Sequence, residues 1–351
     1  MKGLKLNQLI NMISIDGSYG EGGGQILRYA ASYAAAFNTK VEVYNIRVKR
    51  PNPGLRPQHM TLLKIMNNVF GGYIDGLYIG STRVTMNFSK IKAIRGTYDI
   101  GTAGSISLIL QALIPPLLLA DSPSQFTLKG GTDVRWSPPI DYMKAIYSRL
   151  IQLYGGFIDI KIRRRGFYPR GGGIVDIYVE PAELKGWERI ERNSISKVLV
   201  YNVVYKLSRH VLNRQRETIE KLIKGFIDVP LEVFDEYGRD SLDPGTSIVL
   251  AGIYDSFVSG GDSLGERGKP AEKVSEGAFI KFKSWYLSKA SLDIHAGDMM
   301  IPIATLADSK VLYSVPEYTP HMDSAIYVAK LFSDKKIMIE KRQSYYVLSF
   351  R

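Results

Sequence analysis

The chain has 351 residues, of which 45% are hydrophobic, so it is long enough for two domains and a large core. It contains no cysteine, which excludes disulfides, thiol nucleophiles and cysteine-ligated zinc. Its 46 Lys and Arg residues against 34 Asp and Glu residues give a net charge of +12. This excess indicates a polyanionic partner, with nucleic acid ahead of a membrane surface, although a generally basic soluble protein would show the same charge.

The amino-terminal segment MKGLKLNQLINM has no clean apolar core and no small-residue cleavage site, so no secretory signal is predicted. The longest apolar run, residues 106–120, is too short to span a bilayer and contains Gln111 and a Pro-Pro pair. We therefore expect no membrane span and a cytoplasmic location.

The first structural unit opens at Asp16 with a glycine-rich loop that leads directly into a helix ending near Phe37. Glycines let the backbone approach a ligand, and a helix N-terminus attracts anions through its unpaired N–H groups. Glu21 in the loop is a candidate Mg²⁺ ligand, and Arg28 in the helix is a candidate phosphate ligand. The sequence then predicts a strand over 40–47, a proline-broken basic loop, a helix over about 60–69 and strands through residue 88.

The same order of elements recurs twice. Asp99 opens a second glycine-bearing loop and an apolar helix, and a third copy begins at Asp293. The second copy continues with a strand, a proline-broken loop, a helix and strands over 125–129, 130–139, 141–154 and 157–179. The third copy has the corresponding elements over 310–315, 316–321, 322–332 and 336–350. We therefore predict three repeated α/β (α+β) units, at about 16–90, 99–183 and 293–351, that pack against one another.

Residues 184–281 break this pattern. They contain a predicted strand over 197–205, a charged helix over 213–226, further strands and a turn rich in glycine and serine. A helix over about 271–289 leads the chain back to the repeats. We expect a smaller α/β domain over 184–281, inserted into a large domain formed by 1–183 and 282–351.

Two of the four histidines occupy matching positions, because His59 and His321 each precede a second helix and are each followed by methionine. His321 follows a proline that fixes the backbone, and Asp323 is placed to orient its ring or to cap the helix. A histidine nucleophile needs one free ring nitrogen while the other is held. A histidine at such a junction also serves as a cap or as a satisfied polar residue, so the pattern alone leaves both roles open.

Two basic loops are candidates for binding phosphates. The first contains Arg47, Arg50 and Arg56, whose guanidinium groups can each bind a pair of oxygens, although a solvated basic surface has the same composition. The second contains residues 163–165 and Arg170 with neighbouring aromatic residues, and it is predicted to follow a nucleic-acid backbone. Among the carboxylates, Asp298 in the third glycine loop is a second candidate Mg²⁺ ligand or a helix first-turn residue, and Asp141 is predicted to cap a helix.

Six segments resemble the RNA 3′-terminal phosphate cyclases, in the order of that family and over essentially the whole chain. They are DGSYGEGGGQILR, RPNPGLRPQH, GTAGSISLILQALIPPLL, KGGTDVRWSPPIDY, RGFYPRGGG and PHMDSAIYVAKLF. The resemblance implies three βαβαββ-type units with a smaller α/β domain inserted before the third. It also implies the ATP-dependent conversion of an RNA 3′-phosphate to a 2′,3′-cyclic phosphodiester, with Mg²⁺ or Mn²⁺.

The resemblance further implies three nucleotidyl transfers. His321 attacks the α-phosphate of ATP, AMP then passes to the RNA 3′-phosphate to form RNA(3′)pp(5′)A, and the 2′-OH finally displaces AMP. Carried over residue by residue, Glu21 contacts the metal, Arg28 and Arg47 act in catalysis, and further residues bind ATP or its phosphates. These further residues are Arg50, Gln58, His59, Gln111, Pro138, Pro139, His295 and Asp298, with His295 and one of the prolines flanking the adenine. The candidates for RNA contact are Arg56 and Arg170.

One position departs from the resemblance, because Met299 stands where many members of the family have a glutamine. The alternative function is that of the catalytically inactive cyclase-like proteins, which bind RNA in ribosomal RNA processing and lack the nucleophilic histidine. The presence of His321 favours the enzyme. The expected partners are ATP and RNA with a 3′-phosphate end, and the pattern leaves a homodimer or a higher oligomer open.

Overall fold

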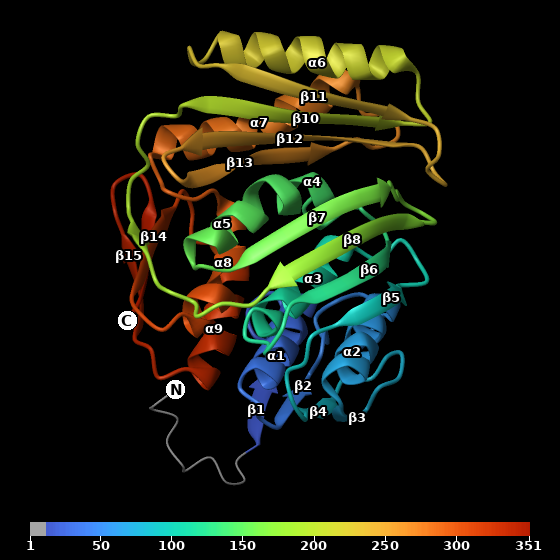
Figure 1. The fold of residues 1–351 in the computed structure, drawn as a ribbon, viewed down its shortest axis with the longest axis vertical. Helices are drawn as coiled ribbons and strands as arrows, with labels where there is room; N and C mark the ends of the chain where they lie inside the picture. The colour runs from blue at the N-terminus through green and yellow to red at the C-terminus, as the bar shows by residue number, and fades with distance from the viewer. Residues whose placement is uncertain (1–11) are drawn as a thin grey trace.

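The computed structural model describes residues 12–351, and Figure 1 shows their arrangement. Residues 1–11, to which most of the prediction about a secretory signal applies, lie outside this range. None of the helices in the described part of the chain is long and apolar enough to cross a membrane.

The first unit forms a four-stranded sheet in the order β1-β2-β4-β3, with β1 and β2 parallel. Its elements are β1 (Ile13–Asp16), α1 (Gly24–Ala36), β2 (Val41–Tyr44), α2 (Pro57–Phe70), β3 (Gly72–Asp75) and β4 (Val84–Phe88). Alternate residues of β2 are buried, as expected for a strand with one face on the core. The strand predicted over 40–47 ends at Tyr44 because Asn45 and Arg47 adopt left-handed backbone angles, with φ of 52° and 56°.

The second unit repeats this topology, with the sheet order β5-β6-β8-β7 and a parallel β5–β6 pair. Its second helix begins at residue 140, close to the predicted start, and contains a π-helical turn at its centre. The elements are β5 (Arg95–Asp99), α3 (Ile106–Leu117), β6 (Ser124–Gly130), α4 (Ile140–Tyr142), η1 (Met143–Tyr147), α5 (Ser148–Leu153), β7 (Phe157–Arg164) and β8 (Gly173–Glu180).

The third unit has the same order again, β9-β14-β16-β15, with β9 parallel to β14. Its elements are β9 (Glu188–Arg189), α8 (Ile294–Leu306), β14 (Val311–Val315), α9 (Pro320–Phe332), β15 (Ile337–Lys341) and β16 (Tyr346–Phe350). The first strand of this unit therefore lies within residues 184–281, the segment that was predicted as the insertion.

That segment forms a fourth sheet, in the order β11-β10-β12-β13, with a hydrophobic cluster of its own. It contains β10 (Lys197–Tyr205), α6 (Arg209–Lys224), β11 (Leu231–Gly238), β12 (Gly245–Tyr254), β13 (Phe257–Leu264) and α7 (Ala271–Ser288). Figure 1 shows this sheet at one end of the molecule, where it contacts α4 and α5 of the second unit. A bridge between Glu191 and Ala290 joins the two ends of the segment. We propose that the inserted domain spans residues 190–290.

The predicted α+β fold class is confirmed. The helices that follow the glycine loops form the centre of the large domain, because α1 packs against α3 and α9, and α8 packs against α3 and α9. Three fully buried alanines of α1, Ala30, Ala31 and Ala34, allow this close approach. This packing fixes the positions of the helix ends, which together form the site described below.

Candidate active site

The first glycine loop lies between α2 and α9. Gly20 and Gly22 have positive φ of 55° and 59°, which favours glycine. A Cβ atom on Gly24 would lie 2.3 Å from His59 Nε2, and one on Gly20 would lie 2.8 Å from Ser324 Oγ. Helix α1 begins without a side-chain cap and without an acidic residue in its first turn. Its first N–H groups therefore remain available to an anion.

Three arginines around this helix end have buried Nε atoms with no hydrogen-bond partner within residues 12–351, namely Arg28, Arg47 and Arg50. Burial lowers the pKa of Arg47, and the nearby charges of Arg50 and Arg56 lower it further. Burial also lowers the pKa of Arg28. Buried donors normally have acceptors, so this cluster of like charges indicates a site for an anion with several oxygens, such as a phosphate.

His59 is buried beside these arginines and is held by the backbone of α2. Its Nδ1 accepts a hydrogen bond of 3.2 Å from the Arg56 N–H, so the proton of a neutral ring is assigned to Nε2. Burial, together with the charges of Arg28, Arg47 and Arg56, lowers the pKa of His59 to about 3. His59 is therefore a neutral donor at the start of α1 rather than a base.

His321 lies in the first turn of α9, immediately after Pro320. Its side chain is 54% exposed, and its Nε2 is 3.6 Å from Glu21 Oε2. The same Glu21 oxygen accepts a hydrogen bond of 3.2 Å from Arg50 Nη2. Asp323, which was predicted to orient His321 or to cap the helix, instead accepts a hydrogen bond of 2.8 Å from the Tyr318 hydroxyl, and Thr319 caps the helix. The structure thus brings His321, Glu21 and Arg50 together.

Asp298 of α8 contacts the start of α1 by accepting hydrogen bonds from Gln25. Both carboxylate oxygens accept hydrogen bonds from Gln25 Nε2, at 2.8 and 3.0 Å. Burial raises the pKa of Asp298, although His321, the bond from Gln25, and the charges of His295 and Arg28 oppose this rise. Sequence reasoning did not assign Gln25 to the site. The signal was its position one helical turn before Arg28, which places both side chains on one face of α1.

Met299, which stands where many members of the family have a glutamine, is contacted by Gln111. Gln111 of α3 is buried, and its Nε2 donates to the Met299 sulfur at 3.1 Å. Methionine sulfur is a weak acceptor, so the amide of Gln111 is still oriented toward α8.

His295 lies one turn before Asp298 in α8, beside the start of α4. The rings of His295 and Tyr142 meet edge to face, with centroids 6.1 Å apart. The Tyr142 hydroxyl donates to Asp293, the N-cap residue of α8, at 2.6 Å. Pro139 is the N-cap residue of α4, so the structure brings the two predicted adenine-flanking segments to the same place.

Two residues of the inserted segment hold the other side of His295, and sequence reasoning missed both. His295 Nε2 lies 3.4 Å from Lys281 Nζ and 3.6 Å from Asp262 Oδ1. Lys281 and Asp262 form an ion pair of 3.1 Å with each other. No local pattern could identify them, because β13 and α7 bring them together from separate parts of the inserted segment.

The remaining predicted residues divide between two places. Gln58 borders the second glycine loop, because a Cβ atom on Gly104 would lie 3.6 Å from its Cγ. Arg56 precedes it at the N-cap of α2. Arg170, by contrast, binds the inserted segment, with its Nε 3.0 Å from Asp243 Oδ1. Its guanidinium group is therefore already paired in this structure.

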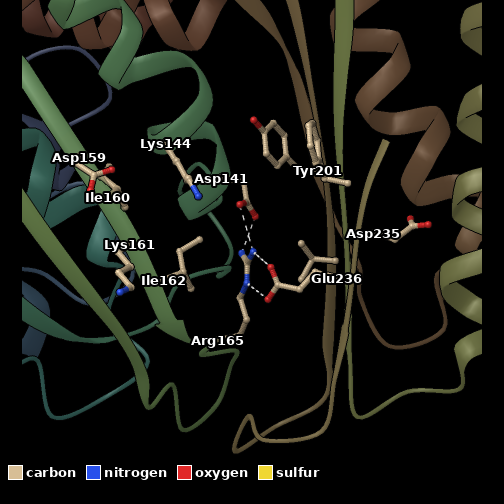
Figure 2. A pocket seen from close by; sticks show the side chains of 12 residues that line it. Asp141, Lys144, Asp159, Ile160, Lys161, Ile162, Arg165, Tyr201, Asp235 and Glu236 are labelled. Atoms are coloured by element: carbon tan, nitrogen blue, oxygen red, sulfur yellow. Dashed lines mark hydrogen bonds and ion pairs between the residues drawn. The ribbon is translucent and has the colours of Figure 1, made fainter. Parts of the chain in front are cut away.

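The prediction that residues 163–165 follow a nucleic-acid backbone is wrong for Arg165. Its side chain is 1% exposed and lies between the second unit and the inserted segment (Figure 2). It pairs with Asp141 and Glu236 at 2.6 Å each, and with Asp133 at 3.5 Å. Asp141 is therefore an ion-pair partner rather than the predicted cap. Arg165 turns inward because these carboxylates compensate the charge that burial would otherwise leave unpaired.

Within the described range, no group of three or more acidic or histidine side chains could form a metal cage. Glu21 is a single, half-exposed carboxylate beside the arginine cluster. Mg²⁺ is commonly held by one or two carboxylates together with phosphate oxygens and water. Glu21 therefore fits a metal ion that is bound mainly by phosphates.

The structure therefore has three βαβαββ units and a fourth sheet formed by the segment between β9 and α8. The three units together form a site lined by histidines and arginines. The family model for RNA 3′-terminal phosphate cyclase matches residues 19–339. The chain is 40% identical over 339 residues to the RNA 3′-terminal phosphate cyclase of Pyrobaculum aerophilum, covering 96% of this chain and 97% of that protein.

Two further relatives with the same name give similar values. The protein of Pyrobaculum neutrophilum is 42% identical over 342 residues, which cover 96% of this chain and 97% of that protein. The protein of Pyrococcus furiosus is 40% identical over 325 residues, which cover 92% and 94%. The chain therefore belongs to the RNA 3′-terminal phosphate cyclase family, and the resemblance predicted from its sequence is confirmed.

Proposed function

We propose that this chain converts an RNA 3′-phosphate to a 2′,3′-cyclic phosphodiester at the expense of ATP, through a covalent His321–AMP intermediate, in the cytoplasm. Its relatives are named RNA 3′-terminal phosphate cyclase. The observation that supports the proposal most directly is the position of His321. It is half exposed, 3.6 Å from Glu21, and faces a helix end surrounded by arginines whose buried Nε atoms have no acceptor in the described structure.

In the first step, a ring nitrogen of His321 attacks the α-phosphorus of ATP. A P–N bond forms, the bond to the β-phosphate oxygen breaks, and pyrophosphate leaves. Arg28, Arg47 and Arg50 would bind the phosphate oxygens together with the N–H groups of α1, which stabilises the charge that develops on them. Mg²⁺ or Mn²⁺ held at Glu21 would supply further charge neutralisation when bound.

In the second step, an oxygen of the RNA 3′-phosphate attacks the same phosphorus, the P–N bond breaks, and RNA(3′)pp(5′)A forms. In the third step, the neighbouring 2′-OH attacks the 3′-phosphorus and AMP leaves. His59 is neutral and donates from Nε2, so its part is to bind a phosphate oxygen rather than to remove the 2′-OH proton. His295 and Pro139 would enclose the adenine, while Asp298 and Gln25 hold the α1 and α8 ends together.

The test is incubation of the protein with α-³²P-ATP and Mg²⁺, followed by denaturing electrophoresis. We expect a labelled band that is labile to acid and stable to alkali, as a phosphoramidate is. His321→Ala should abolish the band. His210→Ala, which changes an exposed histidine at the start of α6, is the matched control and should keep it.

The outcomes separate the two functions. RNA with a 3′-phosphate added to the labelled wild-type protein should remove the label and give a cyclic end. A wild-type protein that binds RNA ends but is never labelled would support the inactive, RNA-binding alternative. Equal labelling of the wild type and His321→Ala would mean that another residue is the nucleophile.

A further inference from the structure

A groove of about 470 Å³ lies between the second unit and the inserted domain, apart from the His321 site. Figure 2 shows its two walls, which are β7 with η1 on one side and β10 with β11 on the other. None of its lining residues contributes to the site proposed above for ATP and the RNA 3′ end. Its volume lies in the range of small-molecule sites.

One wall of the groove presents a pair of stacked aromatic rings. Tyr201 and Phe234 are direct neighbours on the parallel strands β10 and β11, and their ring centroids are 5.2 Å apart at an interplanar angle of 21°. Asn202, the next residue of β10, bonds to the backbone of α6, so the aromatic pair lies on the face of the sheet away from that helix. Phe234 is 48% exposed. Tyr201 is partly buried, so Phe234 presents the more accessible ring. A stacked aromatic pair of this kind is a typical platform for a nucleobase.

The groove lining carries four carboxylates and three cations, and two of the cations are unpaired in the described structure. Lys144 and Lys161 line it, and their side chains make no ion pair within residues 12–351. Burial raises the pKa of Tyr201, the nearby positive charge of Arg149 opposes this rise, and the negative charges of Asp141 and Glu232 add to it. Of the four lining carboxylates, only Asp159 has no ion-pair partner in the described structure. The other three are Asp141 and Glu236, paired with Arg165, and Asp235, paired with Arg216.

We propose that this groove binds a nucleotide of the RNA substrate upstream of its reacting 3′ end. The base stacks on Phe234 and Tyr201, and the phosphodiester backbone is bound by Lys144 and Lys161. The inference rests on the proposed function, because that function makes single-stranded RNA the substrate. Both β7 and β11 are edge strands, so a protein segment that adds to one of them is the competing occupant. Such a segment would bind through its backbone and would not require the lysines or the ring pair.

The test compares two RNAs with the same 3′-phosphate end, one of three and one of about twenty nucleotides. For Phe234→Ala, we expect the KM of the longer RNA to rise on the order of tenfold, because stacking of a base on an aromatic ring contributes about 1–3 kcal/mol. Its kcat, the KM of the three-nucleotide RNA and self-adenylylation should not change. Phe157→Ala removes a ring of similar exposure from β7 outside the groove and should leave all four quantities unchanged.

The lysines are tested by the salt dependence of binding. Removing both Lys144 and Lys161 should reduce the slope of log K against log salt concentration for the longer RNA by about 1.4, since each phosphate contact on a single strand contributes about 0.7. This measurement uses fluorescence anisotropy and an RNA without a 3′-phosphate. It therefore tests the groove even if the protein proves unable to react with ATP.

Three results would overturn the inference. Equal losses for both RNAs would place the effect at the active site, and unchanged binding of the longer RNA would show that the groove does not contact it. A change of oligomeric state in Phe234→Ala, measured by light scattering, with RNA binding intact would assign the surface to a second copy of the chain.

Discussion

Replacement of Arg165 by methionine should destabilise the protein strongly. Arg165 is 1% exposed and is the only cation that pairs with Asp141 and Asp133 among the described residues. Methionine removes the charge and leaves both carboxylates buried without compensation. Breaking a buried ion pair in this way costs about 3–5 kcal/mol. Glu236 is 42% exposed at its side chain, so the loss of its pair adds no more than about 1 kcal/mol.

The loss should depend on pH in a defined direction. Burial raises the pKa of Asp133 above its ordinary value of 3.8, and the charge of Arg165 opposes that rise. Without Arg165 the pKa of Asp133 rises further. Where folding raises the pKa of a carboxylate, the folded state binds the proton more tightly than the unfolded state. The protein therefore loses stability as the pH rises through the pKa of the folded state. Arg165→Met should therefore be less destabilising at pH 5 than at pH 8.

The measurement is urea unfolding, followed by the fluorescence of tryptophan. Trp285 lies fully buried in the inserted domain and reports on its unfolding. Arg163→Met is the control, because its pair with Asp176 at 2.8 Å is largely exposed and should contribute less than about 1 kcal/mol. A loss below about 1 kcal/mol for Arg165→Met, or the same loss at both pH values, would refute the reasoning.

Three further predictions concern the active site. Gly24→Ala should reduce self-adenylylation by roughly tenfold or more while the circular dichroism spectrum is kept, because the new Cβ would lie 2.3 Å from His59 Nε2. In NMR titrations, His59 should stay neutral down to about pH 4, since its pKa is lowered to about 3, and the protein should lose stability as the pH falls below 6.5. Asp262→Asn should raise the KM for ATP roughly tenfold with little change in kcat, because the ion pair with Lys281 that holds His295 is lost. A normal KM would show that the ring is held without it.

Much of the fold could be predicted because its signals are local and repeated. The glycine loops, the proline-broken loops and the strands recur in the same order, and the strand predicted over 197–205 has those bounds in the structure. Strand β9 could not be predicted, because two residues show no periodicity. Only its pairing with β14, across the inserted segment, defines it as a strand.

The residues of the site can also be divided into those that the sequence could predict and those that it could not. Residues in glycine- and proline-fixed loops, such as Glu21 and Arg50, could be predicted because the loop itself positions them. Arg165 could not be predicted, because a run of arginines is typical of a solvated surface. The carboxylates that pair with it lie elsewhere in the second unit and in the inserted segment. Asp262 could not be predicted either, because it lies far from His295 in the sequence and is close to it only in the folded protein.

The position of β9 has a consequence for the order of folding during synthesis. The chain completes β9 before the inserted domain and its parallel partner β14 after it. The third sheet therefore cannot close until the intervening residues 190–310 are accommodated. The inserted domain has its own hydrophobic cluster, and its ends meet where the Arg192 N–H bonds to the Lys289 carbonyl at 3.0 Å. Once this domain has folded, β9 and α8 are already adjacent, and the remaining loop-closure entropy is small. The meeting of the two ends of the inserted segment thus places the two separate parts of the third unit, which contains His321, next to each other.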